Sequence, residues 1–126
     1  MNNYKIRVEN GAESREAQEL FFELGCHWYY NGKQRIERVT GTINSGDDMS
    51  LTTGYMFNDN HKEITLPELR DLVVLKRNDF GDAQYTDEGG FKVYKTSDNK
   101  FYYFEHRQFG NSQYQTWVES AINGRY

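Results

Sequence analysis

The sequence predicts an α+β fold, a mostly antiparallel sheet of hairpins with two to three short helices packed on one face. Short segments rich in aromatic and β-branched residues recur along the chain, and most are bounded by Asn, Asp or Gly. Two other segments show apolar residues at helical spacing. A length of 126 residues fits a single domain over 1–126. A two-lobe organisation, with 1–78 and 90–126 joined by the loop 79–89, is the alternative.

The first elements are a strand and a helix. Residues 4–9 alternate apolar and polar side chains, which predicts a half-buried strand that ends at Asn10-Gly11. The stripe Ala17, Leu20, Phe21 and Leu24 then predicts a helix. Ser14 is the expected N-cap and Gly25 the expected left-handed C′ residue.

Hairpins are expected next. Residues 26–30 predict a strand, Asn31-Gly32 predicts a type I′ turn, and residues 34–43 predict the return strand, with Ile36 and Val39 as its apolar anchors. A loop over 44–48, a strand over 49–57 and a turn over 58–60 complete this part of the chain.

A second helix begins with a clear start signal. Thr65 and Glu68 form a predicted capping box, and Pro67 falls in the first turn, where a missing N–H costs little. The helix is expected to cover 66–73. Val74 and Leu75 fit either an extension of this helix or the start of a strand.

The C-terminal part begins with the expected loop and continues with a second hairpin. Residues 91–96 and 100–106 predict two strands around a turn at 97–99. The segment from Tyr114 to Ile122 fits both helical and strand spacing, so both interpretations stay open.

Composition excludes several classes of protein. The formal net charge of -4 and the mixed charges argue against a general nucleic-acid-binding protein. The single Cys26 allows no internal disulfide, and no apolar run approaches the ~18 residues of a membrane span. Because Met1–Lys5 lacks the apolar stretch of a signal peptide, the expected location is the cytoplasm.

No catalytic or cofactor motif stands out. His27, His61 and His106 are scattered without metal-ligand spacing, and Asp47, Asp48, Asp79 and Asp82 do not match a calcium loop. Phosphate-binding glycine loops and nucleophile elbows do not occur. We therefore predict a protein that is not an enzyme and has no cofactor or metal site.

Aromatic and basic residues on the two hairpins form the predicted binding surface. The sequence contains twenty aromatic residues (10 Tyr, 8 Phe and 2 Trp), and the two predicted hairpins carry rings on both strand faces. One small core covers only one face of a sheet, so some of these rings need another partner. Such rings and cations lie in a core, at a protein interface or around a ligand pocket. The predicted binding residues are Trp28, Tyr30, Arg35, Arg38, Tyr94, Tyr102, Phe104 and Arg107.

Two segments carry a resemblance to a group of known proteins. Residues 17–30 (AQELFFELGCHWYY) and 62–79 (KEITLPELRDLVVLKRND) resemble elements of small accessory proteins of large tailed bacteriophages. The resemblance implies a non-catalytic role, in which the protein binds a host protein or sequesters a nucleotide signal of a defence system. It assigns no functional residue.

The leading functional hypothesis is a phage-encoded inhibitor or modulator that binds a host defence protein through exposed aromatic rings. The first alternative is a sponge protein for a nucleotide-derived small molecule, with its pocket at a symmetric homodimer interface. The second alternative is a small metal-dependent hydrolase or nuclease that uses the acidic loops.

Overall fold

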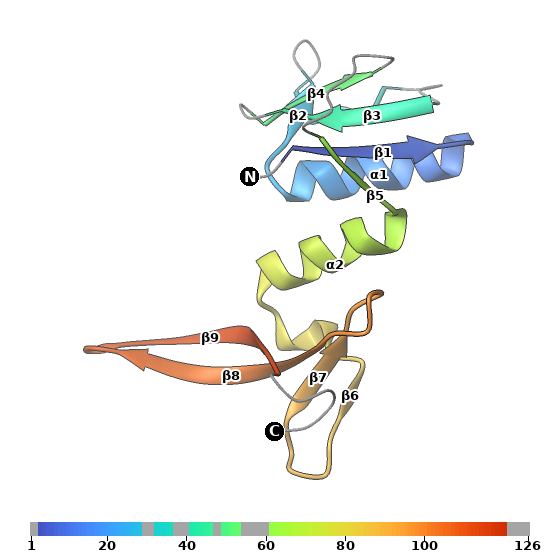
Figure 1. The fold of residues 1–126 in the computed structure, drawn as a ribbon. Coiled ribbons are helices and arrows are strands. Elements are labelled where there is room, and N and C mark those ends of the chain that lie inside the picture. Colours follow the sequence, from blue (N-terminus) through green and yellow to red (C-terminus); the bar gives the residue numbers. More distant parts are fainter. Residues whose placement is uncertain (1–2, 29–31, 37–40, 47–48, 54–60, 121–126) are drawn as a thin grey trace. The chain divides into compact units, whose positions relative to one another are not determined.

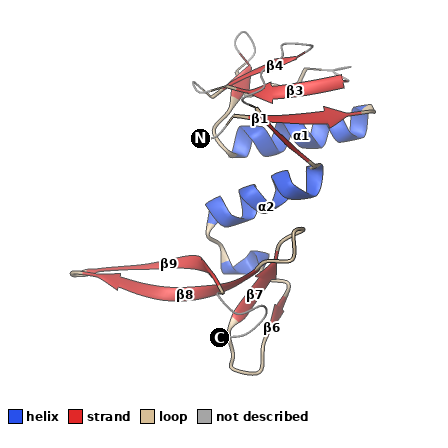
Figure 2. Ribbon diagram, in the orientation of Figure 1, coloured by secondary structure: helices blue, strands red, loops and turns tan. Residues whose placement is uncertain are grey.

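The computed structural model of the chain describes residues 3–28, 32–36, 41–46, 49–53 and 61–120. These residues form two α-helices, a 3-10 turn and nine strands, and the strands pair into two mostly antiparallel sheets (Figures 1 and 2). The predicted α+β class is therefore confirmed. The elements in chain order are β1 (Tyr4–Val8), α1 (Gly11–Glu23), β2 (His27–Trp28), β3 (Gly41–Ser45), β4 (Ser50–Thr53), β5 (Lys62–Ile64), α2 (Leu66–Arg77), η1 (Phe80–Asp82), β6 (Tyr85–Thr86), β7 (Lys92–Lys95), β8 (Phe101–Phe109) and β9 (Ser112–Glu119).

The chain divides into two compact units, Met1–Val73 and Val74–Tyr126, and the boundary falls inside α2. Residues 79–89 contain η1 and β6 and belong to the second unit. In the described part of the chain, no helix is both long and apolar enough to cross a membrane.

The first unit is a five-stranded mixed sheet in the order β2-β4-β3-β1-β5. β1 pairs antiparallel with β3 and parallel with β5, while β2 pairs parallel with β4. The predicted alternation in β1 is confirmed, because Tyr4, Ile6 and Val8 are buried and share one face. That face packs on α1, whose Ala17 and Phe21 are completely buried.

Helix α1 begins earlier than predicted. Asn10 rather than Ser14 is the N-cap, and its Oδ1 accepts a hydrogen bond from the Glu13 N–H at 2.9 Å. The C-terminal prediction is confirmed. Gly25 has φ +100°, and a Schellman motif closes the helix with Gly25 N–H to Phe22 C=O and Cys26 N–H to Phe21 C=O.

The first predicted hairpin is wrong. A two-residue turn at positions 31 and 32 would place Trp28 opposite Arg35, whereas Trp28 pairs with Gly32. Residues 33–36 form no strand, and β3 pairs with β1 and β4 rather than with β2. Val39 and the predicted turn at 58–60 lie outside the described residues.

Helix α2 has the predicted capping box. The Glu68 carboxylate accepts from the Thr65 N–H at 3.0 Å, and the Thr65 hydroxyl accepts from the Glu68 N–H at 3.3 Å. The helix continues to Arg77, so Val74 and Leu75 are helical.

The second unit is a four-stranded antiparallel sheet in the order β6-β7-β8-β9. The predicted hairpin of β7 and β8 is confirmed, and β9 resolves the ambiguity of the C-terminal segment as a strand up to Glu119. Val74, Tyr94, Phe104 and Trp117 form its buried core.

Candidate binding pocket of the second unit

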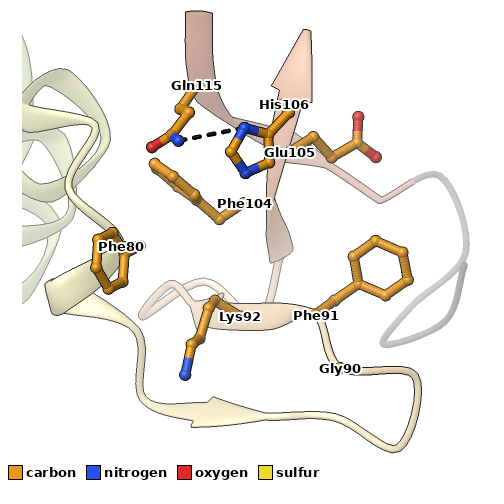
Figure 3. A pocket seen from close by; sticks show the side chains of 8 residues that line it. All are labelled: Phe80, Gly90, Phe91, Lys92, Phe104, Glu105, His106 and Gln115. Carbon is orange, nitrogen blue, oxygen red and sulfur yellow. Dashed lines mark hydrogen bonds between the residues drawn. The ribbon is translucent and has the colours of Figure 1, made fainter.

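A pocket of about 560 Å³ lies in the second unit, beside the start of β7 and the middle of β8. Aromatic rings and four polar side chains line it (Figure 3). The lining residues are Phe80, Gly90, Phe91, Lys92, Phe104, Glu105, His106 and Gln115.

A short 3-10 turn holds Phe80 at the pocket. The Asp79 carboxylate caps η1 by accepting from the Gly81 N–H at 2.8 Å, and the Arg77 guanidinium forms a two-pronged contact with Asp82 at 3.0 and 2.9 Å. The chain is therefore fixed on both sides of Phe80, yet 57% of this residue is exposed. The ring is thus positioned without being buried.

Phe104 forms the opposite apolar wall. Its ring meets that of Trp117 edge to face at 5.0 Å and that of Phe80 at 6.1 Å, inclined by 55°. Trp117 also contacts Tyr94 at 6.0 Å. Phe104 therefore connects the buried core of the unit with the pocket surface.

Polar groups lie on the same side of the sheet. His106 and Gln115 are directly opposite each other on β8 and β9, and Gln115 Nε2 lies 3.2 Å from His106 Nδ1. Lys92 Nζ donates to Thr86 Oγ1 at 2.9 Å, which leaves two of its three N–H donors for other partners.

Phe91 and Glu105 lie on the opposite face of the sheet from Phe104 and His106, as strand alternation requires (Figure 3). Phe91 packs edge to face on Tyr103 with ring centroids 6.1 Å apart. The turn before β7 is held by Asp87, whose carboxylate accepts from the Phe91 N–H at 2.9 Å. Gly90 in this turn has φ +87°, a conformation that favours glycine.

The predicted binding residues are divided between the two units. Trp28 is buried in the first unit, where its Nε1 donates to Gln18 Oε1 at 3.0 Å, so the expected exposed ring is not found there. Arg35 is exposed in the same unit and forms an ion pair with Glu19 at 3.5 Å. Tyr30 and Arg38 lie outside the described residues.

Tyr94, Tyr102 and Phe104 come together in the core of the second unit. Tyr94 is buried, Tyr102 is half-buried, and only Phe104 of this group lines the pocket. Arg107 lies on β8, and its side chain is outside the described part of the structure.

Sequence reasoning missed most of the pocket residues. Phe80 was the most visible signal, because it is a single large ring in a run of Asn, Asp and Gly. Phe91 similarly follows Gly89-Gly90. His106 and Gln115 carry no such signal, since only the register of β8 and β9 places them together.

The pocket offers an apolar surface with a cation, an imidazole and an amide at its border. Within the described ranges, no group of three or more His, Cys, Asp or Glu side chains is placed to hold a metal ion. No protein-family model matches the chain, and the searches of curated proteins and of solved structures also found no match.

Proposed function

We propose that this chain is a non-catalytic interaction protein that binds a partner protein through the second unit. The resemblance to phage accessory proteins suggests that it is an inhibitor or modulator encoded by a phage. Its partner would then be a bacterial host defence protein in the cytoplasm.

One observation carries the proposal. Three large rings with high exposure, Phe80 at 57%, Tyr85 at 47% and Phe91 at 38%, all fall within residues 80–91. When a partner covers an exposed ring, apolar surface is removed from water, which favours binding. Aromatic residues are also enriched among the residues that contribute most to the binding energy of protein interfaces. Two of these rings line the pocket, which gives a partner side chain a place to enter.

A nucleotide-derived ligand is the second candidate. The pocket volume falls within the range of small-molecule sites, and Lys92, His106 and Gln115 could recognise polar groups of a ligand. The inclined arrangement of Phe80 and Phe104 supports it less, because a flat base binds best between parallel faces. In a thermal-shift screen of cyclic oligonucleotides and ADP-ribose derivatives, a true ligand at 100 times its Kd should stabilise the protein by about 2.7 kcal/mol.

Capture of a partner from bacterial lysate, followed by reconstitution with the purified partner, tests the leading proposal. Phe80→Ala should weaken binding by roughly tenfold or more in titration calorimetry, because it truncates an exposed interface ring. Glu88→Ala is the control, since Glu88 is an exposed side chain of the same segment that neither lines the pocket nor belongs to the three exposed rings. Equal binding by the wild type and Phe80→Ala would contradict the pocket as the binding site. A folded protein that captures no specific partner would contradict the proposed function.

A further inference from the structure

The sheet of the first unit has a polar face on the side away from its apolar core. Ile6 on β1 lies opposite Ile43 on β3, and both are buried in the core that also contains Phe21 of α1. Because side chains alternate along a strand, the residues next to Ile6 and Ile43 lie on the other face. On β1 and β3 this face consists of two cross-strand pairs, Lys5 with Asn44 and Arg7 with Thr42, which we call the donor cluster.

Asn44 brings a buried amide without a partner to this cluster. Only 3% of the residue is exposed, and its Nδ2 atom is buried. Among the residues that the structure describes, none accepts a hydrogen bond from this nitrogen. A buried donor without a partner is unfavourable, and buried polar groups in native proteins are normally satisfied by protein, by water or by a bound molecule. The Asn44 amide can therefore donate to an acceptor from outside the described chain.

Two cations lie on the same face as this amide. Lys5 is directly opposite Asn44, and Arg7 follows two residues later on β1. Lys5 is half-buried and Arg7 is exposed, as is Thr52, the neighbour of Asn44 on β4, so solvent reaches this face. Within the described ranges, neither cation forms an ion pair with a carboxylate. Both charges are thus available to a dissolved anion.

Every side chain of the donor cluster can donate hydrogen bonds. The ammonium, the guanidinium, the amide and the hydroxyl all carry N–H or O–H groups, and the two cations carry no acceptor. Residues directly opposite on an antiparallel sheet lie roughly 5 Å apart at Cβ, and residues i and i+2 of a strand lie about 7 Å apart. The long side chains of Lys5 and Arg7 can therefore reach the same small group as Asn44. An anion with several acceptor oxygens fits this set of donors.

We propose that the donor cluster binds a phosphate group, carried either by inorganic phosphate or by a small phosphate ester. A phosphate ester has about two negative charges at pH 7 and three strong acceptor oxygens, which match two cations and two neutral donors. A carboxylate has one charge and two oxygens, so it would satisfy fewer of these donors. The site lies in the first unit and is independent of the proposed function, which uses the second.

Two acidic residues follow the same alternation and oppose the anion. Glu63 lies opposite Lys5 on β5, and Glu9 follows Arg7 by two residues; both are exposed. In the described part of the chain, neither is ion-paired with a cation of the donor cluster. Glu63→Gln removes one negative charge beside Lys5 and should strengthen phosphate binding by up to about fivefold. Weaker binding by this variant would contradict the site.

Titration of the full chain with inorganic phosphate, phenyl phosphate and acetate, followed by NMR of ¹⁵N-labelled protein at constant ionic strength, tests the site. Both phosphate compounds should shift the side-chain amide signal of Asn44 and backbone amides of β1 and β3 in a saturable way. The tighter of the two shows whether the free ion or an ester is preferred. Acetate should bind at least roughly tenfold more weakly. Phosphate titrations without a saturable shift at Asn44, or equal binding of acetate, would overturn the proposal.

Three variants separate the donor cluster from the general charge of the protein. Arg7→Gln and Asn44→Ala each remove donors to a charged group and should weaken phosphate binding by roughly tenfold or more. Lys62→Gln is the matched control, because it removes one positive charge from the same sheet while Lys62 lies opposite Tyr4 on the other face. It should change binding by less than about threefold, since salt screens distant charges. Equal losses in Arg7→Gln and Lys62→Gln would overturn the site, and this comparison decides even where Asn44→Ala does not fold.

The remaining outcomes distinguish this site from other ligands and from the proposed function. If a single-stranded oligonucleotide shifts the Asn44 amide while both small phosphate compounds do not, the face is a nucleic-acid surface and the phosphate site is wrong. If a partner is captured through Phe80 but phosphate does not bind, the proposed function stands without this site. If phosphate binds as described but lysate yields no partner protein, the site stands while the proposed function loses its support.

Discussion

The side chain of Gln18 shows how a single buried amide can organise a loop. Gln18 is 1% exposed and forms four hydrogen bonds. Its Oε1 accepts from Trp28 Nε1 at 3.0 Å and from Ile36 N–H at 2.8 Å, while its Nε2 donates to Ser14 Oγ and Ile36 C=O at 3.0 Å each. The amide thus replaces the missing strand partner of the backbone at Ile36.

Replacing Gln18 should therefore destabilise the first unit. Gln18→Leu keeps the approximate volume but leaves the Trp28 N–H and both backbone groups of Ile36 without partners, at a cost of about 2–4 kcal/mol in the free energy of unfolding. Urea denaturation measures the change. Gln34→Leu is the control, because Gln34 is exposed in the loop that Gln18 holds. Equal changes in the free energy of unfolding for the two substitutions would show that the hydrogen bonds of Gln18 do not stabilise the first unit.

At the scale of elements, α1 and α2 are joined within the first unit by Glu16 and Arg70. The Arg70 guanidinium donates through Nε and Nη2 to the Glu16 carboxylate, with the Nη2 contact at 2.8 Å. This hydrogen bonding, aided by the charge of Arg70 and opposed by partial burial, lowers the pKa of Glu16 below its usual value of 4.5.

The lowered pKa predicts how stability depends on pH. A carboxyl group with a lower pKa in the folded than in the unfolded state stabilises the protein above the unfolded pKa, and loses that contribution as pH falls through the folded pKa. The difference in unfolding free energy between wild type and Glu16→Gln should therefore be larger at pH 7 than at pH 3, because it declines as the pH falls through the lowered pKa. Because both side chains are substantially exposed, it should stay below about 1 kcal/mol.

Urea denaturation at both pH values, with and without 1 M NaCl, measures this contribution. Salt should reduce the difference at pH 7, because it screens exposed charges. A difference that grows as the pH falls would contradict the assigned sign.

At the scale of the whole molecule, each unit has its own apolar core. Ile6, Phe21 and Leu69 belong to the first core, whereas Tyr94 and Phe104 belong to the second. Helix α2 contributes Leu69 and Val73 to the first core and Val74 to the second. Stability should accordingly be governed locally by the core in which a residue lies.

Truncations in the two cores should act on different amides. Phe21→Ala removes a completely buried ring and should cost about 3–5 kcal/mol, expressed mainly in faster hydrogen exchange of β1 and β3. Trp117→Ala, in which a buried ring of the second core is lost, should act mainly on β7, β8 and β9. Equal acceleration of all slow amides by either substitution would show that the chain unfolds as one cooperative body.

The local elements were predictable because their signals are local. Capping at Thr65 and Glu68 and the left-handed C′ residue Gly25 each involve residues within one turn of helix. Asn10 replaced Ser14 as the N-cap because the helix starts at Gly11, six residues before Ala17, where its apolar stripe begins. Ser14 instead accepts a bond from Gln18. Neither choice is visible from apolar spacing alone.

The candidate site was less predictable. Phe104 was expected at a binding surface and lines the pocket, but Trp28 and Tyr94 are buried, which the excess of aromatic residues could not reveal. The Asp79 cap and the Arg77–Asp82 contact fix η1 and so hold Phe80 at the pocket. A run of Asn, Asp and Gly predicts only a loop.

By itself, the sequence determined the α+β class, the positions of two helix starts to within a few residues and the hairpin of β7 and β8. These depend on periodicity, capping and turn chemistry, all of which act between near neighbours. Tertiary structure alone decided that β3 lies between β1 and β4, that the C-terminal segment is a strand, and that β8 runs past β7 beside a pocket. Strand pairing over long separations depends on which faces and edges meet in the folded chain, and no short stretch of residues encodes that choice.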